Sequence, residues 1–450
     1  MRILIPTDAF PPVCGGSGWS TYELARGLRS RGHEVTIVQP RPGTPAGVRE
    51  TEYDGFGVRE LGAPAPDIPY VRNYYKNEKL TRSLGRYLAT LVQGGRYDIV
   101  HAQHVMTTMA AIDAAHAAHI PAVATVRDYW PVCYWSDLLH TREGLALCPA
   151  CTAGNMTLCI RPRAGALWPL ALPMIPYMRA NLAAKREGLA RADAVIAVSH
   201  RIARDLVQRA PELSRTRVDV IPNAVNIEAL HLSAGALTKA DLSAGALTEA
   251  DLSAGALTEA DLSAGALAKA EPYALYIGKL APNKGTGYLV DVVRGADLDW
   301  PLIVAGDGPD RAALERAAAA SGRRIEFRGW VEKDEAAALL AGAAMLIFPS
   351  RGPESLSRVL LEASALGIPI AAMDTGGTRD IIDHEATGLL STTPEGLAAD
   401  VRRLRQDAAL RQRLGDAARR KMEREFDSAS VVARVETLYE DLVERRRRCR

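Results

Sequence analysis

Residues 1–38 read MRILIPTDAFPPVCGGSGWSTYELARGLRSRGHEVTIV, and their pattern indicates the fold class. Residues 3–5 form an apolar run that predicts a short buried strand, residues 17–31 predict a helix, and residues 35–38 predict a second strand. A buried strand, a crossover helix and another buried strand make up the unit from which parallel sheets with helices on their faces are built.

The same alternation continues along most of the chain. Helix-like stretches separate two further series of short apolar runs, the first at 99–100, 122–126, 194–198 and 218–221, the second at 274–277, 302–305, 325–327, 345–348 and 368–372. We therefore expect an α/β protein with two doubly wound, Rossmann-like domains that face each other across a cleft. The expected parts are a first domain at 1–222, a second at 223–425, and a C-terminal helix at 426–450 that packs back on the first domain.

Residues 232–271 interrupt this alternation with four ten-residue repeats, LSAGALTKAD, LSAGALTEAD, LSAGALTEAD and LSAGALAKAE. Leucine recurs every five residues, and a helix that turns about 100° per residue would scatter such leucines around its axis. The five-residue period resembles pentapeptide-repeat solenoids, and the alternative is a duplicated surface insertion. Neither interpretation gives the repeat a role in catalysis.

Composition excludes several classes of protein. The 450 residues are 48% hydrophobic, which excludes a wholly disordered or fibrous chain, and the net charge of +2 argues against broad nucleic-acid binding. No apolar run reaches the ~18 residues of a membrane span, and the first residues read as a strand and not as a signal peptide. Six cysteines in 450 residues are too few for a fold held together by disulfide bonds. We expect a cytoplasmic protein.

One stretch suggests contact with a membrane surface. Residues 167–178 are mostly apolar, and the basic residues Arg179, Lys185 and Arg186 follow them. Such a stretch can dock peripherally on a membrane or cover a lipid acceptor. The alternative is a buried irregular segment.

Two loops that follow predicted strands carry residues suited to anions. Gly15 and Gly16 follow the first strand, where glycines let a ligand approach the backbone and the next helix offers free N–H groups. A flexible turn is the alternative. Lys279 and Lys284 follow the first strand of the second domain, and two lysines five residues apart there can reach one polyanion.

Residues 349–363, PSRGPESLSRVLLEA, place Glu354 and Glu362 eight residues apart. If the stretch is helical throughout, this offset spans roughly 12 Å. The backbone N–H groups of residues 355–358 would then form a positive helix end for a diphosphate. Because carboxylates accept hydrogen bonds from hydroxyls, the array suits a sugar, a phosphate pair and a ribose in sequence.

These motifs resemble those of glycosyltransferase family 4, retaining glycosyltransferases of the GT-B fold. The matching stretches are 11–38, VIPNAVN (220–226), ALYIGKLAPNKG (274–285), LIVAGDGP (302–309), residues 348–377 and ATGLL (386–390). The resemblance covers nearly the whole chain outside the repeat, and the spacing of Glu354 and Glu362 is its most specific element.

The resemblance implies retaining transfer of a sugar, as a hexosyl group, from a nucleotide-diphosphate donor to a saccharide or lipid-linked acceptor in polysaccharide biosynthesis. It implies that Lys279 and Lys284 bind the diphosphate, that Glu362 binds the ribose and that Glu354 contacts the transferred sugar. The remaining implied donor-binding residues are Gly15, Gly16, Trp330, Ser355, Leu356, Ser357 and Arg358. No cofactor is required for catalysis.

Arg127 departs from the family pattern, because many relatives carry histidine there. Arginine can donate hydrogen bonds and stabilise a leaving diphosphate, but it stays protonated and cannot act as a base. We assign catalytic roles to Arg127, Glu354 and Lys284. His101 and His104 follow another strand, and a structural role is favoured for each. The alternatives to transfer are a nucleotide-sugar epimerase on the same fold and a non-catalytic sugar-nucleotide-binding protein.

Four cysteines form a separate motif. Cys133, Cys148, Cys151 and Cys159 have the spacing C-x14-C-x2-C-x7-C, and the central pair has the spacing of zinc ligands. Four thiolates can complete a tetrahedral structural zinc site. The alternative is four free or partly paired thiols.

Overall fold

The computed structural model describes residues 1–67, 74–95, 97–138, 148–233 and 271–448. The chain forms two compact units, one from Met1–Ala224 together with Ser428–Arg450 and the other from Val225–Asp427. Each sequence-based boundary, after residue 222 and after residue 425, lies two residues before the observed one. The predicted solenoid and its alternative fall on the repeat, of which residues 234–270 lie outside the described part.

Within the described residues, the first unit is built around an eight-stranded sheet of order β3-β4-β2-β1-β5-β6-β7-β8. Neighbouring strands run parallel, apart from the antiparallel hairpin of β3 and β4 at one edge. Sequence analysis missed this hairpin, because β3 is mostly exposed and lacks an apolar run. The strands are β1 (Arg2–Pro6), β2 (Glu34–Pro42), β3 (Gly47–Tyr53), β4 (Phe56–Ala63), β5 (Ile99–Gln103), β6 (Ala122–Val126), β7 (Ala194–Ala197) and β8 (Val218–Val220).

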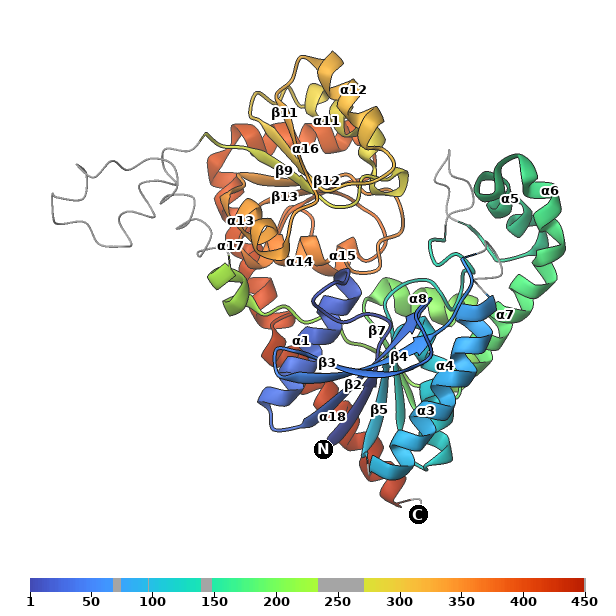
Figure 1. Cartoon of the computed structure of the whole chain (residues 1–450). Helices are drawn as coiled ribbons and strands as arrows, with labels where there is room; N and C mark the ends of the chain where they lie inside the picture. Colours follow the sequence, from blue (N-terminus) through green and yellow to red (C-terminus); the bar gives the residue numbers. More distant parts are fainter. Residues whose placement is uncertain (68–73, 96, 139–147, 234–270, 449–450) are drawn as a thin grey trace. The chain divides into compact units, whose positions relative to one another are not determined.

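Helices cover both faces of this first sheet. Figure 1 shows α1 (Gly16–Ser30) and α18 (Ser428–Arg448) on one face and α3 (Leu80–Gly95) and α4 (Val105–Ala117) on the other. The other helices of this unit are α5 (Ala153–Ala164), α6 (Trp168–Ala171), α7 (Ile175–Leu189) and α8 (His200–Arg209), with short helical turns at Tyr75–Lys79, Gly165–Leu167, Leu172–Met174 and Pro211–Arg215.

The C-terminal helix α18 is part of the first core. Its residues Val432 and Tyr439 are fully buried among side chains of α1 and the sheet. Gly27 of α1 permits this contact, because a Cβ atom there would lie 2.4 Å from Cγ2 of Val432. The first unit is therefore completed by a segment that follows the second unit in the sequence.

In the part that the structure describes, the second unit has a six-stranded parallel sheet of order β11-β10-β9-β12-β13-β14. Helix α11 packs against α12 and α16, and α14 packs against α13 and α17. The strands are β9 (Ala274–Ile277), β10 (Leu302–Ala305), β11 (Ile325–Gly329), β12 (Met345–Phe348), β13 (Ile370–Met373) and β14 (Leu389–Ser391). The helices are α11 (Leu289–Gly295), α12 (Arg311–Ser321), α13 (Lys333–Gly342), α14 (Arg358–Ala365), α15 (Thr378–Ile381), α16 (Pro394–Gln406) and α17 (Ala408–Glu425), with short turns at Pro282–Lys284 and Thr286–Tyr288.

Each sheet contains one point at which the strand order reverses. In the first sheet β1 lies between β2 and β5, and in the second β9 lies between β10 and β12. Open α/β sheets bind ligands at such points, beyond the carboxyl ends of the strands. The loops after β1, β5, β9 and β12 are therefore the places at which a site is expected.

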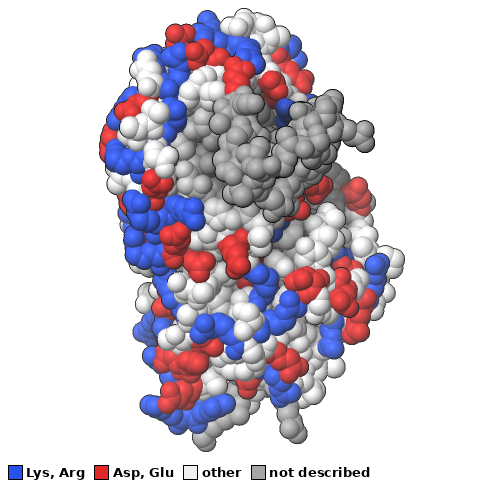
Figure 2. All heavy atoms as spheres, turned by 90° about the vertical axis from the view of Figure 1, so that its left-hand side faces the viewer, with Lys and Arg blue, Asp and Glu red and all other residues white. Residues whose placement is uncertain are grey.

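The surface carries charges of both signs. Figure 2 shows basic and acidic side chains interspersed over one face, in keeping with the net charge of +2. Among the described residues, no helix is both long enough and apolar enough to cross a membrane.

Candidate active site

A lysine–glutamate pair, Lys284 and Glu354, occupies the switch point of the second sheet. Lys284 ends the turn that follows β9, and Glu354 lies in the loop after β12. The Lys284 Nζ atom is 2.6 Å from Oε1 of Glu354, which also accepts a hydrogen bond from Ser350 Oγ at 2.5 Å. The structure thus joins two predicted site residues, 70 positions apart in the chain, into one ion pair in which Glu354 is mostly buried and Lys284 is partly exposed.

Two glycines fix the loops that hold this pair. Gly285 has φ 71°, and a Cβ atom there would lie 1.9 Å from the carbonyl oxygen of Pro349. Gly376, in the loop after β13, has φ 57°, and a Cβ atom there would lie 1.9 Å from the carbonyl oxygen of Glu354. Because only glycine fits at both positions, three strand-end loops can close tightly around the Glu354 backbone.

The helix after Glu354 begins later than expected. Helix α14 starts at Arg358 with Ser357 as its N-cap, so Ser355 and Leu356 lie in the loop before the helix. The estimate of roughly 12 Å between the two glutamates assumed a continuous helix, and this condition is not met. The free N–H groups of the helix start belong to the turn that Arg358 opens.

Glu362 lies one helical turn beyond Arg358 and pairs with it. Oε1 of Glu362 accepts hydrogen bonds from Arg358 Nη2 at 2.8 Å and from Nε at 3.2 Å. Both side chains are mostly buried. The pair holds the Glu362 carboxylate in one orientation on the helix that leads away from the switch point.

The other predicted donor-binding residues lie on exposed loops. Lys279 is exposed directly after β9, and Trp330, which follows β11, is 74% exposed. Gly15 is the N-cap of α1 and Gly16 is its first residue, and both are exposed in the loop after β1. A Cβ atom at Gly15 would meet nothing within 4 Å, so packing does not explain that glycine.

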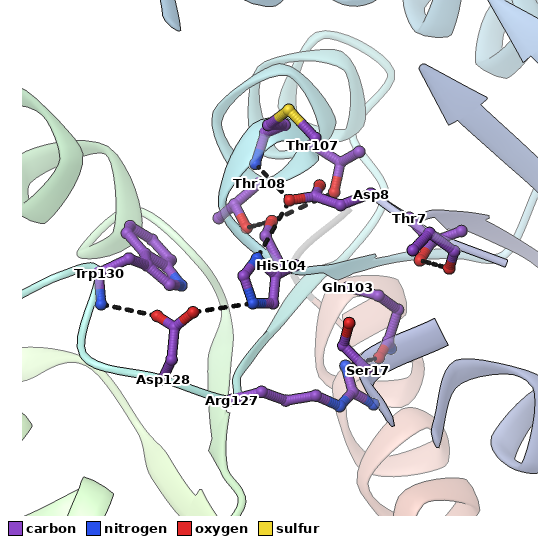
Figure 3. Close-up of polar contacts among 12 residues, drawn as sticks. Thr7, Asp8, Ser17, Gln103, His104, Thr107, Thr108, Arg127, Asp128 and Trp130 are labelled. Carbon is purple, nitrogen blue, oxygen red and sulfur yellow. Dashed lines mark hydrogen bonds and ion pairs between the residues drawn. The ribbon is translucent and has the colours of Figure 1, made fainter. Parts of the chain in front are cut away.

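The first unit carries an aspartate–histidine cluster, Asp8, His104 and Asp128, at its own switch point (Figure 3). The three residues follow β1, β5 and β6. His104 Nδ1 is 3.1 Å from Oδ2 of Asp8, and its Nε2 is 3.0 Å from Oδ2 of Asp128. Burial lowers the pKa of His104, but the hydrogen bonds and charges of Asp128 and Asp8 outweigh it and raise the pKa to about 10.

Sequence analysis missed this cluster. It favoured a structural role for His104 and did not single out Asp8 or Asp128. The available signal was positional, because all three polar residues stand two to four positions after the end of a predicted buried strand. Strand ends that are neighbours in a parallel sheet bring such residues together.

Arg127 is directed away from this cluster. Its Nε donates to Oδ1 of Asn223 at 3.0 Å, its Nη1 donates to Oε1 of Gln103, and the residue is 8% exposed. Figure 3 shows the guanidinium turned toward Gln103, on the side of its loop opposite to Asp128. The Arg127 guanidinium is therefore buried and does not contact the aspartate–histidine cluster.

His101 has the structural environment expected for it. Its Nδ1 lies 2.5 Å from the Tyr439 hydroxyl, and its Nε2 lies 2.6 Å from Thr125 Oγ1. Burial, followed by the charge of Arg127, lowers its pKa to about 3. His101 is therefore a neutral, buried link between β5 and α18.

The four cysteines of the predicted metal motif line a single cavity. Cys133, Cys148 and Cys159 are buried, Cys151 is partly buried, and none of the four forms a disulfide bond within the described residues. The thiols of Cys133 and Cys148 point at oxygen acceptors, Asp137 Oδ1 at 3.9 Å and the Ala150 carbonyl at 3.3 Å. No three His, Cys, Asp or Glu side chains of the described residues are arranged as ligands of a metal ion.

Comparison with known families identifies the chain. The family model for Glycosyltransferase Family 4 matches residues 14–229, and the model for Glycosyl transferases group 1 matches residues 271–407. The chain belongs to glycosyltransferase family 4. As a family 4 glycosyltransferase, it has the predicted GT-B fold of two α/β domains with largely parallel sheets.

Relatives of this family 4 glycosyltransferase include enzymes with different donors. The GDP-mannose-dependent alpha-mannosyltransferase of Mycolicibacterium smegmatis is 25% identical over 425 residues, which cover 93% of this chain and 92% of that protein. The alpha-D-kanosaminyltransferase of Streptomyces kanamyceticus is 32% identical over 155 residues, which cover 32% of this chain but only 39% of the relative's length. The 2-deoxystreptamine glucosyltransferase of the same organism is matched over 37% of its length, at 33% identity.

Solved structures share the fold across the chain. Anabaena HepE, in a complex with UDP, aligns with a TM-score of 0.63 at 17% identity and covers 98% of this chain and 100% of its own. Sucrose-phosphate synthase from Thermosynechococcus elongatus aligns with a TM-score of 0.66 at 19% identity and covers 98% and 99%.

Proposed function

We propose that this glycosyltransferase transfers a hexosyl group, with retention of configuration, from a nucleotide-diphosphate sugar to a saccharide or lipid-linked acceptor. The observation that carries the proposal is the lysine–glutamate pair, which sets a cation for a diphosphate beside a carboxylate for sugar hydroxyls. Known relatives support the donor class, since HepE has been crystallised with UDP-glucose and the mycobacterial relative depends on GDP-mannose.

In the proposed reaction, the bond between sugar C1 and the diphosphate oxygen breaks, and a bond from C1 to the acceptor oxygen forms on the same face. The acceptor proton passes to the departing phosphate oxygen. An ammonium group has three N–H donors, so Lys284 can keep its contact with Glu354 while it donates to a phosphate. Its charge stabilises the negative charge that develops on the leaving diphosphate. Glu354 accepts hydrogen bonds from the transferred sugar.

The test compares donor use in Lys284→Met, Glu354→Gln and a matched control. In the control, Arg405→Ala removes a partly exposed cation of the same unit, which pairs with Asp299 before β10, at the opposite edge of the sheet. We expect both site variants to lose roughly 100-fold or more in kcat/KM for the donor, as when a transition-state contact is removed, and the control to keep its activity. Donor kinetics that stay unchanged in both site variants would refute the assignment.

Product analysis separates the proposal from its alternatives. Nuclear magnetic resonance of the product gives the anomeric configuration, and inversion would contradict a retaining mechanism. Conversion of a donor to its epimer without any acceptor would identify an epimerase instead. Donor binding without hydrolysis or transfer would identify a non-catalytic sugar-nucleotide-binding protein.

A peripheral membrane contact is a second part of the proposal, and it rests on residues 148–186, which we call the basic arm. The arm contains five Lys and Arg residues and no Asp or Glu. It exposes three large apolar side chains, Leu158 (39%), Leu167 (67%) and Leu170 (76%), and the basic residues Arg161 and Arg179 are also exposed. Exposed apolar groups among cations are the combination that anionic lipid surfaces bind.

Sedimentation with lipid vesicles tests the basic arm. We expect binding to vesicles that contain phosphatidylglycerol, weaker binding to neutral phosphatidylcholine vesicles, and loss of binding in a Leu167→Ser/Leu170→Ser variant. Val207→Ser is the control, because Val207 is exposed to a similar extent (68%) on α8, outside the arm. Equal binding by the variant and the wild type would exclude this surface.

A structural zinc ion remains part of the proposal for the four cysteines. They share one cavity, and the cations Arg163 and Arg209 lie beside it, each donating to a cysteine carbonyl, of Cys159 and Cys148 respectively. Four thiolates around Zn²⁺ carry a net charge of −2, which these cations would balance. Zinc binding requires that all four thiols deprotonate, and that those of Cys133 and Cys148 turn from their oxygen acceptors into the cavity.

A further inference from the structure

The aspartate–histidine cluster is a pre-formed polar site in the first unit, separate from the lysine–glutamate pair of the second. Three loops supply it, and two of them flank the switch point between β1 and β5. Each ring nitrogen of His104 lies 3.0–3.1 Å from a carboxylate oxygen, so the imidazole is held from both sides (Figure 3). Such an arrangement holds two carboxylates in fixed positions at the ligand-binding edge of the sheet.

The backbone of His104 is held in a conformation that histidine rarely adopts. Its φ is 100° and its ψ is 173°, a region populated almost only by glycine. The hydroxyl of Thr108 donates to the His104 carbonyl at 2.6 Å, and the Met106 amide donates to Oδ2 of Asp8 at 3.2 Å. Backbone strain of this kind persists only where surrounding contacts enforce it, and it concentrates at functional sites.

One oxygen of the cluster has no partner within the described residues. Oδ1 of Asp8 is buried and accepts no hydrogen bond there, although a buried carboxylate oxygen without a donor is unfavourable. Asp128 leads from this interior point to the surface, with its side chain 29% exposed beside His104 at 20%. The cluster thus combines a buried acceptor without a partner among the described residues, Oδ1 of Asp8, with a partly exposed carboxylate, that of Asp128.

The charge of the cluster selects the chemistry of its ligand. With the imidazole protonated, Asp8, His104 and Asp128 carry a net charge of −1. Lys185 of α7 also interacts with both carboxylates, and burial lowers its pKa. Ionised carboxylates only accept hydrogen bonds, so the cluster suits a ligand that presents N–H or O–H donors and disfavours a phosphate or carboxylate.

We infer that Asp8 and Asp128 bind neighbouring hydroxyl groups of the acceptor, and that the acceptor end is therefore an uncharged polyol, such as a sugar or cyclitol ring. His104 is a positioning residue in this inference, because it holds both carboxylates and does not itself touch the reacting atoms. The inference rests on the proposed glycosyl transfer, and it adds the substrate class and the residues that recognise it.

The test measures acceptor binding separately from donor binding. Saturation-transfer NMR and titration use a panel of uncharged probes (methyl α-glucoside, methyl α-mannoside and myo-inositol) and their phosphorylated counterparts. We expect the wild type to bind at least one uncharged probe more tightly than its phosphorylated form. Asp128→Asn should weaken this binding about 10- to 100-fold, as expected when a charged acceptor is lost.

Two further variants distinguish recognition from folding. Glycine suits the backbone conformation of residue 104, so the His104→Gly variant should fold. It should nevertheless bind the uncharged probe more weakly, because both carboxylates lose the imidazole that holds them. His116→Gln is the control. It removes a partly exposed histidine that lies 3.7 Å from Asp193, and it should bind the probes like the wild type. In all variants UDP and GDP should raise the melting temperature as in the wild type, because Lys279, Lys284 and Glu362, the residues assigned to the nucleotide, lie in the second unit.

Three results would overturn the inference. They are tighter binding of the phosphorylated probes, equal probe binding in the wild type and Asp128→Asn, and no binding of any uncharged probe to the wild type. Unchanged nucleotide binding in Lys284→Met, with the expected probe affinities intact, would contradict the donor assignment alone. The failure of the one proposal is thus distinguishable from the failure of the other.

Discussion

Replacement of His104 by glycine should remove a pH-dependent contribution to the stability of the first unit. The carboxylates of Asp8 and Asp128 hold the pKa of this imidazole at about 10 in the folded protein, against an ordinary value of 6.5. The folded state therefore binds the proton more tightly than the unfolded state. This stabilisation is fully present below pH 6.5 and is lost as the pH rises through about 10.

The magnitude follows from the two pKa values. At about 1.36 kcal/mol per pKa unit, proton linkage contributes about 4 kcal/mol at pH 7 and about 1.4 kcal/mol at pH 9. The difference between these two contributions is an upper limit, because 20% of the His104 side chain is exposed and water screens its interaction with the carboxylates. We expect the free energy of unfolding to fall by about 2 kcal/mol more between pH 7 and pH 9 in the wild type than in His104→Gly.

Urea unfolding at both pH values, followed by a probe in the first unit, measures this difference. Trp130 is a suitable probe, since it is 1% exposed and its backbone N–H donates to Asp128 at 2.8 Å. His116→Gln serves as the control and should retain the wild-type pH dependence. Equal pH dependence in the wild type and His104→Gly would show that the imidazole is not protonated between the two carboxylates, and the reasoning would fail.

Three other predictions concern separate parts of the chain. Gly376→Ala should abolish donor turnover and lower stability by more than about 1 kcal/mol, because the new Cβ would collide with the Glu354 carbonyl; steady-state kinetics and thermal unfolding measure both. Tyr439→Phe should cost about 1–3 kcal/mol in urea unfolding by leaving one nitrogen of buried His101 unpaired, and an unchanged midpoint would contradict the hydrogen bond. Freshly purified full-length protein should contain one zinc per chain by mass spectrometry, and Cys148→Ser should lose it; iron, or no metal, in the wild type would exclude the zinc site.

The fold class was predictable because buried strands of a parallel sheet leave a strong signal in the sequence. Their residues are apolar on both faces, as in residues 3–5 and 345–348, so each strand appears as a short continuous run. The hairpin of β3 and β4 gives no such run, since one of its strands is exposed on both faces. Its partner pairing comes from tertiary context that a local pattern does not contain.

The candidate site was predictable in part. Lys284 and Glu354 were singled out separately, and the structure joins them, because β9 and β12 are adjacent strands whose loops meet. The start of α14 was wrong by three residues, since the Glu354 carbonyl accepts its hydrogen bond from the Gly377 amide at 2.7 Å in a tight loop and the helix begins at Arg358. The position of Arg127 could not be inferred, because its direction depends on Gln103 and Asn223, which lie 24 and 96 residues away.

The arrangement of α18 has a consequence for synthesis of the protein. The hydrogen bond between His101 and Tyr439 joins residues 338 positions apart, and α18 supplies part of the first core. A ribosome releases the whole second unit before it releases this helix, so the first unit waits with an apolar face uncovered while its neighbour folds. During that interval the nascent chain is a client for chaperones that shield apolar surface, and a premature stop before residue 428 would leave that face permanently open.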